Sequence, residues 1–297
     1  MAGSLVFTVL LHLSEAPRAV SAAQPVADER EVVRATPSCA APDAMHAERC
    51  RTMEAAILAS TVRLRLEELA PAEGGFEVVD HSIGHATVMA GRYLVTHNHF
   101  SLSLANLHDG RLRRLSAYGP DGRVIVQHAP LHVFEVLVAE PQTLVLDFGT
   151  YGRQGALAYF GFSSAEFIDW RTSGLQPGDE VAQVNWDGQR TFVEWVRVAH
   201  RRDQDGAPSL ELENYVAQGA SGGGIFYEGA HVGNNWFHGS VERAESGDVL
   251  RQYTVAALNG ANLLALVNGS DAPGVVQPPP VANETLTAAD GGASFAQ

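Results

Sequence analysis

The sequence predicts an all-β protein, and three observations support that prediction. Short stretches in which every second residue is apolar recur along the chain, as at residues 62–66. Turn-forming Gly and Pro residues separate these stretches, for example at 119–122. Few segments have the length and the 3.6-residue period of a helix. We therefore expect an antiparallel barrel or sandwich.

The predicted strands fill residues 60–267, which we expect to be the folded domain. A polar-apolar alternation or a short apolar run bounded by turn signals marks each strand. Residues 44–58 are expected to form a short helix, and residues 254–267 a last strand and helix. The predicted strands are 62–66, 76–79, 86–89, 93–96, 112–118, 124–126, 133–138, 143–146, 180–184, 191–198, 209–213, 224–227 and 231–233.

The two ends of the chain differ in composition from the middle. Residues 1–23 hold a short apolar core followed by small residues, which is typical of a secretion signal, although His12 interrupts the core and no Arg or Lys precedes it. A frayed extension is the alternative. Residues 24–59 are polar and Ala/Pro-rich, as in a leader or pro-segment. Residues 268–297 are rich in Gly, Pro and Ala, and we expect them to be disordered.

Composition excludes several classes of protein. The chain of 297 residues has a net charge of −14, which argues against a nucleic-acid binder, and no apolar run reaches the roughly 20 residues of a membrane span. Cys39 and Cys50 are the only cysteines. They form one local disulfide if the chain is exported and stay free thiols in a cytoplasm, and their spacing does not fit a zinc site. We expect a secreted monomer that binds no metal.

A glycine-rich run surrounds Ser221. Residues 218–226 are Gln-Gly-Ala-Ser-Gly-Gly-Gly-Ile-Phe, so one serine lies among four glycines directly before an apolar, strand-like segment. Glycine allows backbone amides to crowd around a serine hydroxyl and bind a developing oxyanion. A flexible turn between two strands is the competing interpretation.

A histidine lies upstream at the end of a predicted strand. Residues 93–100 are Tyr-Leu-Val-Thr-His-Asn-His-Phe. A strand can hold a histidine at the rim of a cleft, where the near-neutral pKa of imidazole suits a general base. His99, Asp147 and Ser221 follow one another in that order along the chain.

These stretches resemble the chymotrypsin/trypsin-like serine proteases over roughly residues 60–260. Residues 94–100 fit that family's hydrophobic-hydrophobic-Ser/Thr-Ala-Ala-His-Cys pattern, with His99 at the catalytic position. Residues 219–224, Gly-Ala-Ser-Gly-Gly-Gly, resemble its Gly-Asp-Ser-Gly-Gly-Pro stretch, and residues 178–186 resemble the strand and tryptophan that open its second barrel. The resemblance implies two six-stranded antiparallel β-barrels with the active site in the cleft between them.

The resemblance also implies a serine endopeptidase that acts on polypeptides. Ser221 would be the nucleophile, His99 the base and Asp147 the residue that orients His99. The backbone N–H groups of Gly219 and Ser221 would form the oxyanion hole, and no cofactor would be needed. In the family, the residue six before the serine lies at the base of the primary substrate pocket, so the resemblance implies Tyr215 there, with Val216 beside it. Asn234-Asn235-Trp236, and Asn235 in particular, is expected to line the pocket wall, and an uncharged substrate side chain is expected.

Two departures from the family pattern matter. The chain has Ala220 where the family has the aspartate that binds a newly cut N-terminus, and it lacks the Ile-Val-Gly-Gly start, so bacterial-type relatives are the closer comparison. The triad aspartate usually opens a strand, whereas Asp147 follows one. A direct overlay puts Gln142 at that position, and Glu140 is another nearby carboxylate. Asp147 is predicted because of its distance from His99 and the turn that follows it.

Two other functions fit part of the pattern. Gly219-x-Ser221-x-Gly223 also satisfies the nucleophile turn of α/β-hydrolases, but the Gly-Gly-Gly-Ile-Phe-Tyr that follows Ser221 is a poor helix start. The second alternative, from a different class, is a catalytically inactive binding protein that keeps a protease fold.

Overall fold

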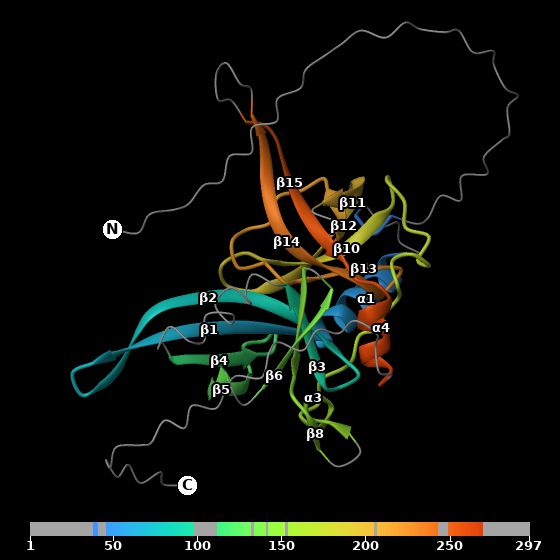
Figure 1. Ribbon diagram of the computed structural model, residues 1–297. Coiled ribbons are helices and arrows are strands. Elements are labelled where there is room, and N and C mark those ends of the chain that lie inside the picture. Colours follow the sequence, from blue (N-terminus) through green and yellow to red (C-terminus); the bar gives the residue numbers. More distant parts are fainter. Residues whose placement is uncertain are drawn as a thin grey trace, which may run out of the picture. The chain divides into compact units, whose positions relative to one another are not determined.

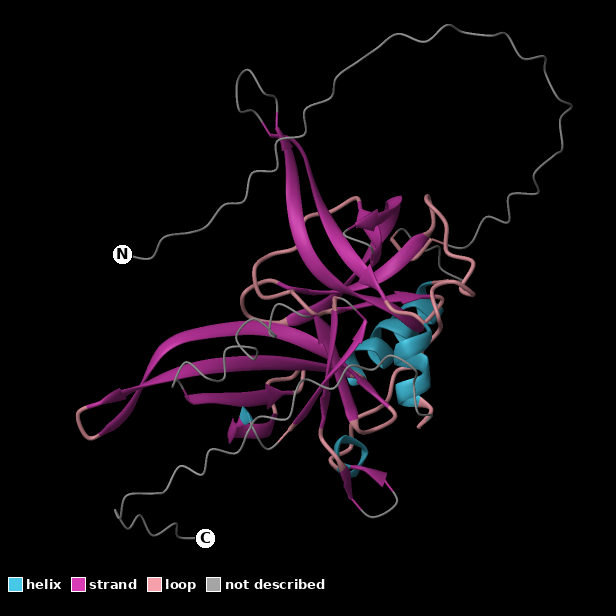
Figure 2. Ribbon diagram, in the orientation of Figure 1, coloured by secondary structure: helices cyan, strands magenta, loops and turns pink. Residues whose placement is uncertain are grey.

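The computed structural model describes residues 38–40, 46–97, 112–131, 134–140, 142–151, 154–204, 207–242 and 249–269. All of them belong to one unit, Pro37–Gln297. The predicted signal peptide, most of the leader, His99 and nearly all of the predicted C-terminal tail lie outside the described residues. Strands make up most of the described chain, as predicted, and the helices are short (Figure 2).

The first half of the chain forms a seven-stranded antiparallel sheet (Figure 1). Its order is β5-β4-β1-β2-β3-β7-β6, one strand more than the predicted six. Every second residue of β1 points into the core, where Val62, Leu64 and Leu66 are buried with Leu94 and Leu144. The strands are β1 (Thr61–Ala72), β2 (Gly75–Met89), β3 (Tyr93–His97), β4 (Leu112–Tyr118), β5 (Val124–Pro130), β6 (Glu135–Glu140) and β7 (Thr143–Asp147).

The second half forms a closed six-stranded barrel in the order β10-β11-β12-β15-β14-β13. This confirms the prediction of a six-stranded antiparallel barrel in this half. Its core holds buried Val, Leu and Ile side chains, among them Val181, Leu212 and Ile225. The strands are β10 (Glu180–Trp186), β11 (Thr191–Gln204), β12 (Ala207–Leu212), β13 (Gly224–Tyr227), β14 (Ala230–Glu242) and β15 (Val249–Leu258).

The remaining elements are short. A two-stranded ribbon, β8 (Thr150–Tyr151) with β9 (Gln154–Gly155), leads into α3 (Ala156–Tyr159), and α4 (Ala261–Val267) follows β15. No helix among the described residues is long and apolar enough to cross a membrane.

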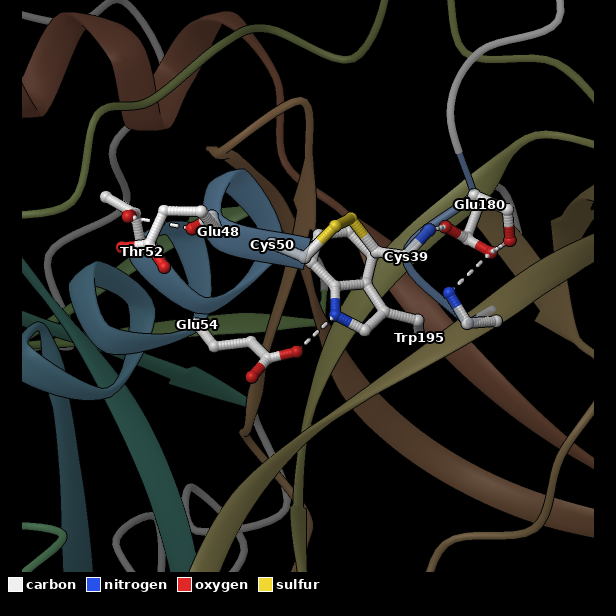
Figure 3. The surroundings of a disulfide bond; sticks show 9 residues. Cys39, Glu48, Cys50, Thr52, Glu54, Glu180 and Trp195 are labelled. Carbon is white, nitrogen blue, oxygen red and sulfur yellow. Dashed lines mark hydrogen bonds between the residues drawn. A yellow bond between two sulfur atoms is a disulfide. The ribbon is translucent and has the colours of Figure 1, made fainter. Parts of the chain in front are cut away.

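The helix α1 (Ala47–Ala59) packs on the barrel, so the folded body begins before residue 60. Ile57 is buried in a cluster with Val184 and Phe226, and the Glu54 carboxylate accepts a hydrogen bond of 2.7 Å from the Trp195 indole. A Cys39–Cys50 disulfide joins this helix to the preceding segment, as Figure 3 shows. The residues expected to be a leader are therefore partly built into the fold.

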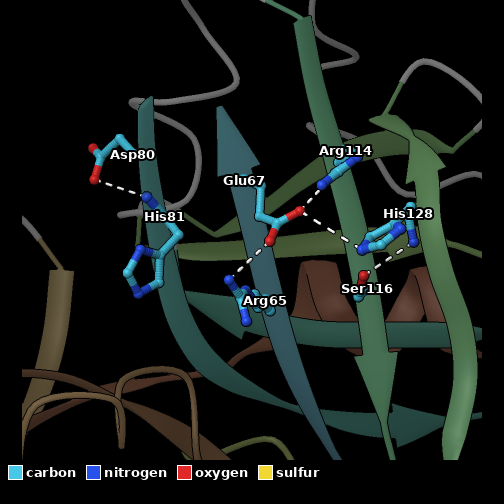
Figure 4. Close-up of polar contacts among 7 residues, drawn as sticks. All are labelled: Arg65, Glu67, Asp80, His81, Arg114, Ser116 and His128. Atoms are coloured by element: carbon cyan, nitrogen blue, oxygen red, sulfur yellow. Dashed lines mark hydrogen bonds and ion pairs between the residues drawn. The ribbon is translucent and has the colours of Figure 1, made fainter. Parts of the chain in front are cut away.

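An ion-pair cluster lies on the first sheet (Figure 4). The buried Glu67 carboxylate accepts a hydrogen bond of 2.5 Å from Arg114 and pairs with Arg65 at 2.9 Å, and His128 lies 3.9 Å away. Burial alone would raise the pKa of Glu67, but the hydrogen bond from Arg114 and the neighbouring positive charges lower it below its ordinary value.

Candidate functional site

Ser221 lies in a tight turn at residues 218–223, directly before β13. Its side chain is partly exposed, whereas the residues on both sides of it are buried. The turn lies against the first sheet, because the Ser221 carbonyl accepts a hydrogen bond of 2.8 Å from the backbone N–H of His85 in β2. The serine is thus held where the barrel meets the sheet.

The backbone donors of residues 219–223 fall into two groups. The N–H groups of Ala220, Gly222 and Gly223 each donate to a carbonyl, at 2.8–3.1 Å. The N–H groups of Gly219 and Ser221 have no acceptor in the part of the chain that the structure describes. These are the two donors that the sequence predicts for an oxyanion hole, and a ligand oxygen is the kind of partner they lack.

Two glycines allow the turn to lie so close to its neighbours. Gly222 has a φ of +79°, and a Cβ there would be 2.2 Å from both the His85 carbonyl and the Thr96 hydroxyl. Gly219 has a φ of +99°, and its Cβ would lie 2.9 Å from the Trp186 ring. An L-residue would therefore be strained at both positions and would also clash.

The strand β3 runs toward this turn and ends at it. A Cβ on Gly222 would touch both Thr96 and His97, the last two residues of β3. His97 is buried and shares a cavity with Ser221. His99 lies outside the described residues. It follows His97 by two residues, and two residues of chain span at most about 7 Å.

Asp147 lies at the opposite end of this strand pair. In the β3–β7 register, His97 faces Thr143 and Tyr93 faces Asp147. Four residues along a strand correspond to about 13 Å. The buried Asp147 carboxylate accepts hydrogen bonds from two guanidinium nitrogens of Arg92, that from Nε at 2.6 Å. It also accepts a hydrogen bond of 2.7 Å from the Gly149 N–H. The register therefore argues against Asp147 as the residue that orients His99.

The start of β7, and not its end, pairs with the end of β3, two residues before His99 in the sequence. Gln142 is buried next to Thr143, which faces His97. The backbone of Glu140, at the end of β6, pairs with Thr143. The alternatives left open by the sequence, Gln142 and Glu140, are thus closer along the sheet to His97 than Asp147 is.

A cavity of about 460 Å³ opens at Ser221. The first sheet supplies β2 and the end of β3, and the barrel supplies Trp186 and the serine turn. The β2 residues at this site were not predicted from the sequence, because they lie between two predicted strands, 76–79 and 86–89, that β2 joins into one. The lining residues are His81, Ser82, Ile83, His97, Trp186, Gln218, Gly219 and Ser221.

The three predicted pocket residues do not line this cavity. Tyr215 is exposed, and its hydroxyl lies 3.3 Å from His238. Val216 is buried against Trp186 and Ala220. Asn235 is buried and supports the serine turn: its amide donates to the Ala220 carbonyl at 3.2 Å and its backbone carbonyl accepts from the Gly222 N–H at 2.8 Å.

A second buried asparagine supports the same turn. The Asn234 amide donates to the Gly222 carbonyl at 2.9 Å, and the Asn234 side-chain oxygen accepts from Asn259 at 2.9 Å. Asn259 in turn contacts the Thr143 hydroxyl at the start of β7. A buried polar chain therefore joins β7 to the serine turn. The sequence signal for it, two adjacent asparagines before Trp236, was interpreted as a pocket wall.

Comparison with known proteins finds similarity in structure only. No protein-family model matches the chain, and no curated protein is similar to it in sequence. Many solved structures are similar at low identity, and three of them illustrate the range. Deg5 is 18% identical, with 64% of this chain and 85% of Deg5 covered and a TM-score of 0.46. The HtrA-type protease AlgW with a tripeptide is 16% identical, with 73% of this chain and 64% of AlgW covered and a TM-score of 0.44. A protease from M. tuberculosis in its active form is 15% identical, with 75% and 85% covered and a TM-score of 0.44. None of these values shows a shared activity, and the chain spans less than two thirds of AlgW.

Proposed function

We propose that this chain is a serine endopeptidase in which Ser221 is the nucleophile and His99 the general base. The observation that supports it most is the pair of N–H groups on Gly219 and Ser221, which have no acceptor among the described residues and lie next to a partly exposed serine in a cavity. Both donors lie in the stretch 219–223, in which the other three N–H groups, those of Ala220, Gly222 and Gly223, donate to carbonyls; two free donors side by side are what a tetrahedral oxyanion needs.

The chemistry follows from these positions. The Ser221 hydroxyl oxygen attacks the carbonyl carbon of the scissile peptide bond while His99 accepts the hydroxyl proton. The carbonyl oxygen becomes an oxyanion and accepts hydrogen bonds from Gly219 and Ser221. The intermediate then expels the amine, which takes the proton from His99, and water hydrolyses the acyl-enzyme in a second, equivalent cycle.

The group that orients His99 comes, in this proposal, from the strand ends that pair beside His97. Gln142 and Glu140 are the residues at these strand ends, whereas the Asp147 carboxylate is hydrogen-bonded to Arg92. An amide at this position would still fix the imidazole by a hydrogen bond, but it would not stabilise the charged imidazolium as a carboxylate does. This gives the alternative function, a binding protein with an inactive protease site, its only specific support.

A fluorophosphonate probe tests the proposal, since it reacts only with an activated serine. We expect stoichiometric labelling of the folded chain at Ser221, no labelling of Ser221→Ala, and loss of labelling in His99→Ala. His97→Ala serves as the comparison for the histidine, because His97 lies two residues before His99 in the sequence and lines the same cavity as Ser221. Folded protein that hydrolyses no casein and takes up no label at Ser221 would leave the inactive binding protein as the better description.

We also place the protein outside the cytoplasm. The Cys39–Cys50 disulfide ties the N-terminal segment to α1, and such bonds persist in oxidising compartments. Mass spectrometry of the chain from its native host, with free thiols alkylated first, checks this. An unmodified disulfide is the expected result.

A further inference from the structure

His85 lies outside the proposed machinery and contacts both residues whose N–H groups are the proposed oxyanion donors. It lies in β2, is fully buried, and is held at four points. Its backbone N–H donates to the Ser221 carbonyl at 2.8 Å, and its backbone carbonyl accepts from the Thr96 hydroxyl at 2.7 Å. Its ring lies 2.9 Å from the Gly219 carbonyl and 2.9 Å from the Thr191 hydroxyl.

These contacts determine the tautomer of the ring. The Gly219 carbonyl can only accept a hydrogen bond, so Nδ1 of His85 must carry the proton that it donates. In the neutral ring Nε2 is then an acceptor, and the Thr191 hydroxyl donates to it. Burial, together with the charge of Arg63, lowers the pKa of His85 to about 4, although the hydrogen bond to Gly219 opposes this shift. The ring is therefore neutral at physiological pH.

From this geometry we infer that His85 is a positioning residue for the oxyanion hole. The inference rests on the proposed function and deepens it. Residue 85 contacts the residues on both sides of Ala220 and so holds both Gly219 and Ser221, whose N–H groups are the oxyanion donors. Gly219 has more conformational freedom than Ser221, because the φ and ψ angles of a glycine, here with φ at +99°, can change without a steric penalty from a side chain. The bond to its carbonyl holds the 219–220 peptide plane, and this limits the rotation of the adjoining 218–219 plane, which carries the Gly219 N–H.

The same residue connects three segments that are distant in sequence. Thr96 lies on β3 and precedes His99 by three residues in the sequence. The serine turn belongs to the barrel, and Thr191 is the first residue of β11. A shift of about 1 Å in a catalytic group can cost about a hundredfold in rate. Loss of the His85 ring should therefore reduce the chemical step while leaving substrate binding nearly unchanged.

Three variants test this. His85→Leu removes both ring contacts, His85→Asn keeps a donor close to the position of Nδ1, and Thr191→Val removes the partner that fixes the tautomer. We expect the maximal rate of fluorophosphonate labelling to fall about 10- to 100-fold in His85→Leu, with its half-saturating concentration within about threefold. His85→Asn should recover most of the rate, and Thr191→Val should lose about three- to tenfold.

His231→Phe is the matched control. His231 is also fully buried, its ring nitrogens have no hydrogen-bond partner among the described residues, and it does not line the cavity. Its variant should label at the rate of the wild type. Thermal unfolding of every variant shows whether it is folded. A folded His85→Leu, or a folded Thr191→Val, that labels as fast as the wild type would overturn the inference, so a misfolded His85→Leu still leaves a decisive variant.

A measurement without turnover separates this inference from the proposed function. Nitrogen-15 NMR of the histidine rings should show one ring with a slowly exchanging Nδ1 proton, absent from His85→Leu. If that signal is present but Ser221 is never labelled, the proposed function is wrong, while the hydrogen bond from His85 to the Gly219 carbonyl is still supported. If His85 instead carries its proton on Nε2, the inference is wrong even in an active enzyme.

Discussion

Asp147 is the residue whose predicted role and observed contacts differ most. It was expected to orient His99, but its carboxylate pairs with Arg92 and caps the Gly149 N–H at the far end of β7. Asp147→Asn should lower the free energy of unfolding by about 1–3 kcal/mol, less than for a fully buried pair, because the Arg92 side chain is 35% exposed.

The same variant should leave the rate of Ser221 labelling within about threefold of the wild type. Urea unfolding measures the first quantity and labelling kinetics the second. Arg92→Met is the control, since it removes the other half of the pair and should destabilise to a similar extent. A loss of roughly 10⁴ in turnover, as expected for a triad aspartate, in a protein of unchanged stability would restore Asp147 to the catalytic role.

Gly222 offers a second test at a single residue. In Gly222→Ala the new Cβ would lie 2.2 Å from the His85 carbonyl and the Thr96 hydroxyl, so the serine turn must move away from β3. We expect labelling of Ser221 to fall at least tenfold. Gly188→Ala is the matched control, because Gly188 has a similar φ of +96° but open space around its Cα. It should cost only the roughly 1–2 kcal/mol of left-handed strain and keep the labelling rate. Equal labelling rates in the two variants would show that the close contact has no role.

Among the elements, α1 is the one that the sequence placed outside the folded domain. It buries Ile57 against the barrel, and Cys50 bonds it to Cys39, whose backbone N–H donates to Glu180 at 2.5 Å. Replacing both cysteines by serine should lower the free energy of unfolding by about 2–3 kcal/mol, as the loss of a short closed loop predicts. Urea unfolding of the variant and of the wild type with and without reductant checks this. Identical midpoints in all three would contradict it.

The strands could be predicted from the sequence far better than the contacts between them. Alternating apolar residues and Gly/Pro turns located β4 at residues 112–118 and placed β7, predicted at 143–146, within one residue. The serine turn was recognised because glycines leave a visible local signal. The β3–β7 register depends on which backbones pair across about 50 residues of chain, and no local pattern encodes it. The sequence therefore located the strand that carries Asp147 but not that Asp147 pairs with Tyr93, at the end of β3 away from His97.

The buried polar residues were missed for a related reason. His85 and Asn235 carry the same side chains as surface residues, and only their burial makes them supports of the serine turn. A histidine followed by an apolar run gives no indication that its ring meets Gly219, 134 residues away. The sequence likewise predicts strands only at 76–79 and 86–89, and the position of the intervening part of β2 at the cavity follows only from how the sheet meets the barrel.

The free energy of unfolding of the whole molecule should fall in acid, because at least two neutral histidines are buried in its interior. Burial lowers the pKa of His231 to about 3 and, together with the charge of Arg63, that of His85 to about 4, from an ordinary 6.5. Above pH 6.5 neither the folded nor the unfolded chain binds a proton at these rings. Between pH 6.5 and about 4 the unfolded chain binds them and the folded chain does not, so stability falls as the pH falls.

The size of this effect can be estimated and tested. Two pH units correspond to about 2–3 kcal/mol for each histidine, so the wild type should lose several kcal/mol between pH 6.5 and 4.5. Glu67, whose pKa is lowered in the fold, adds to the loss only as the pH falls below its ordinary pKa of 4.5. In His231→Phe one titrating ring is gone, and an aromatic ring still packs against Phe226 and Phe167. Urea unfolding at pH 6.5, 5.5 and 4.5 should therefore show a shallower fall for this variant, by about half, whatever its stability at neutral pH. Parallel curves for the two proteins would mean that His231 is already protonated in the fold.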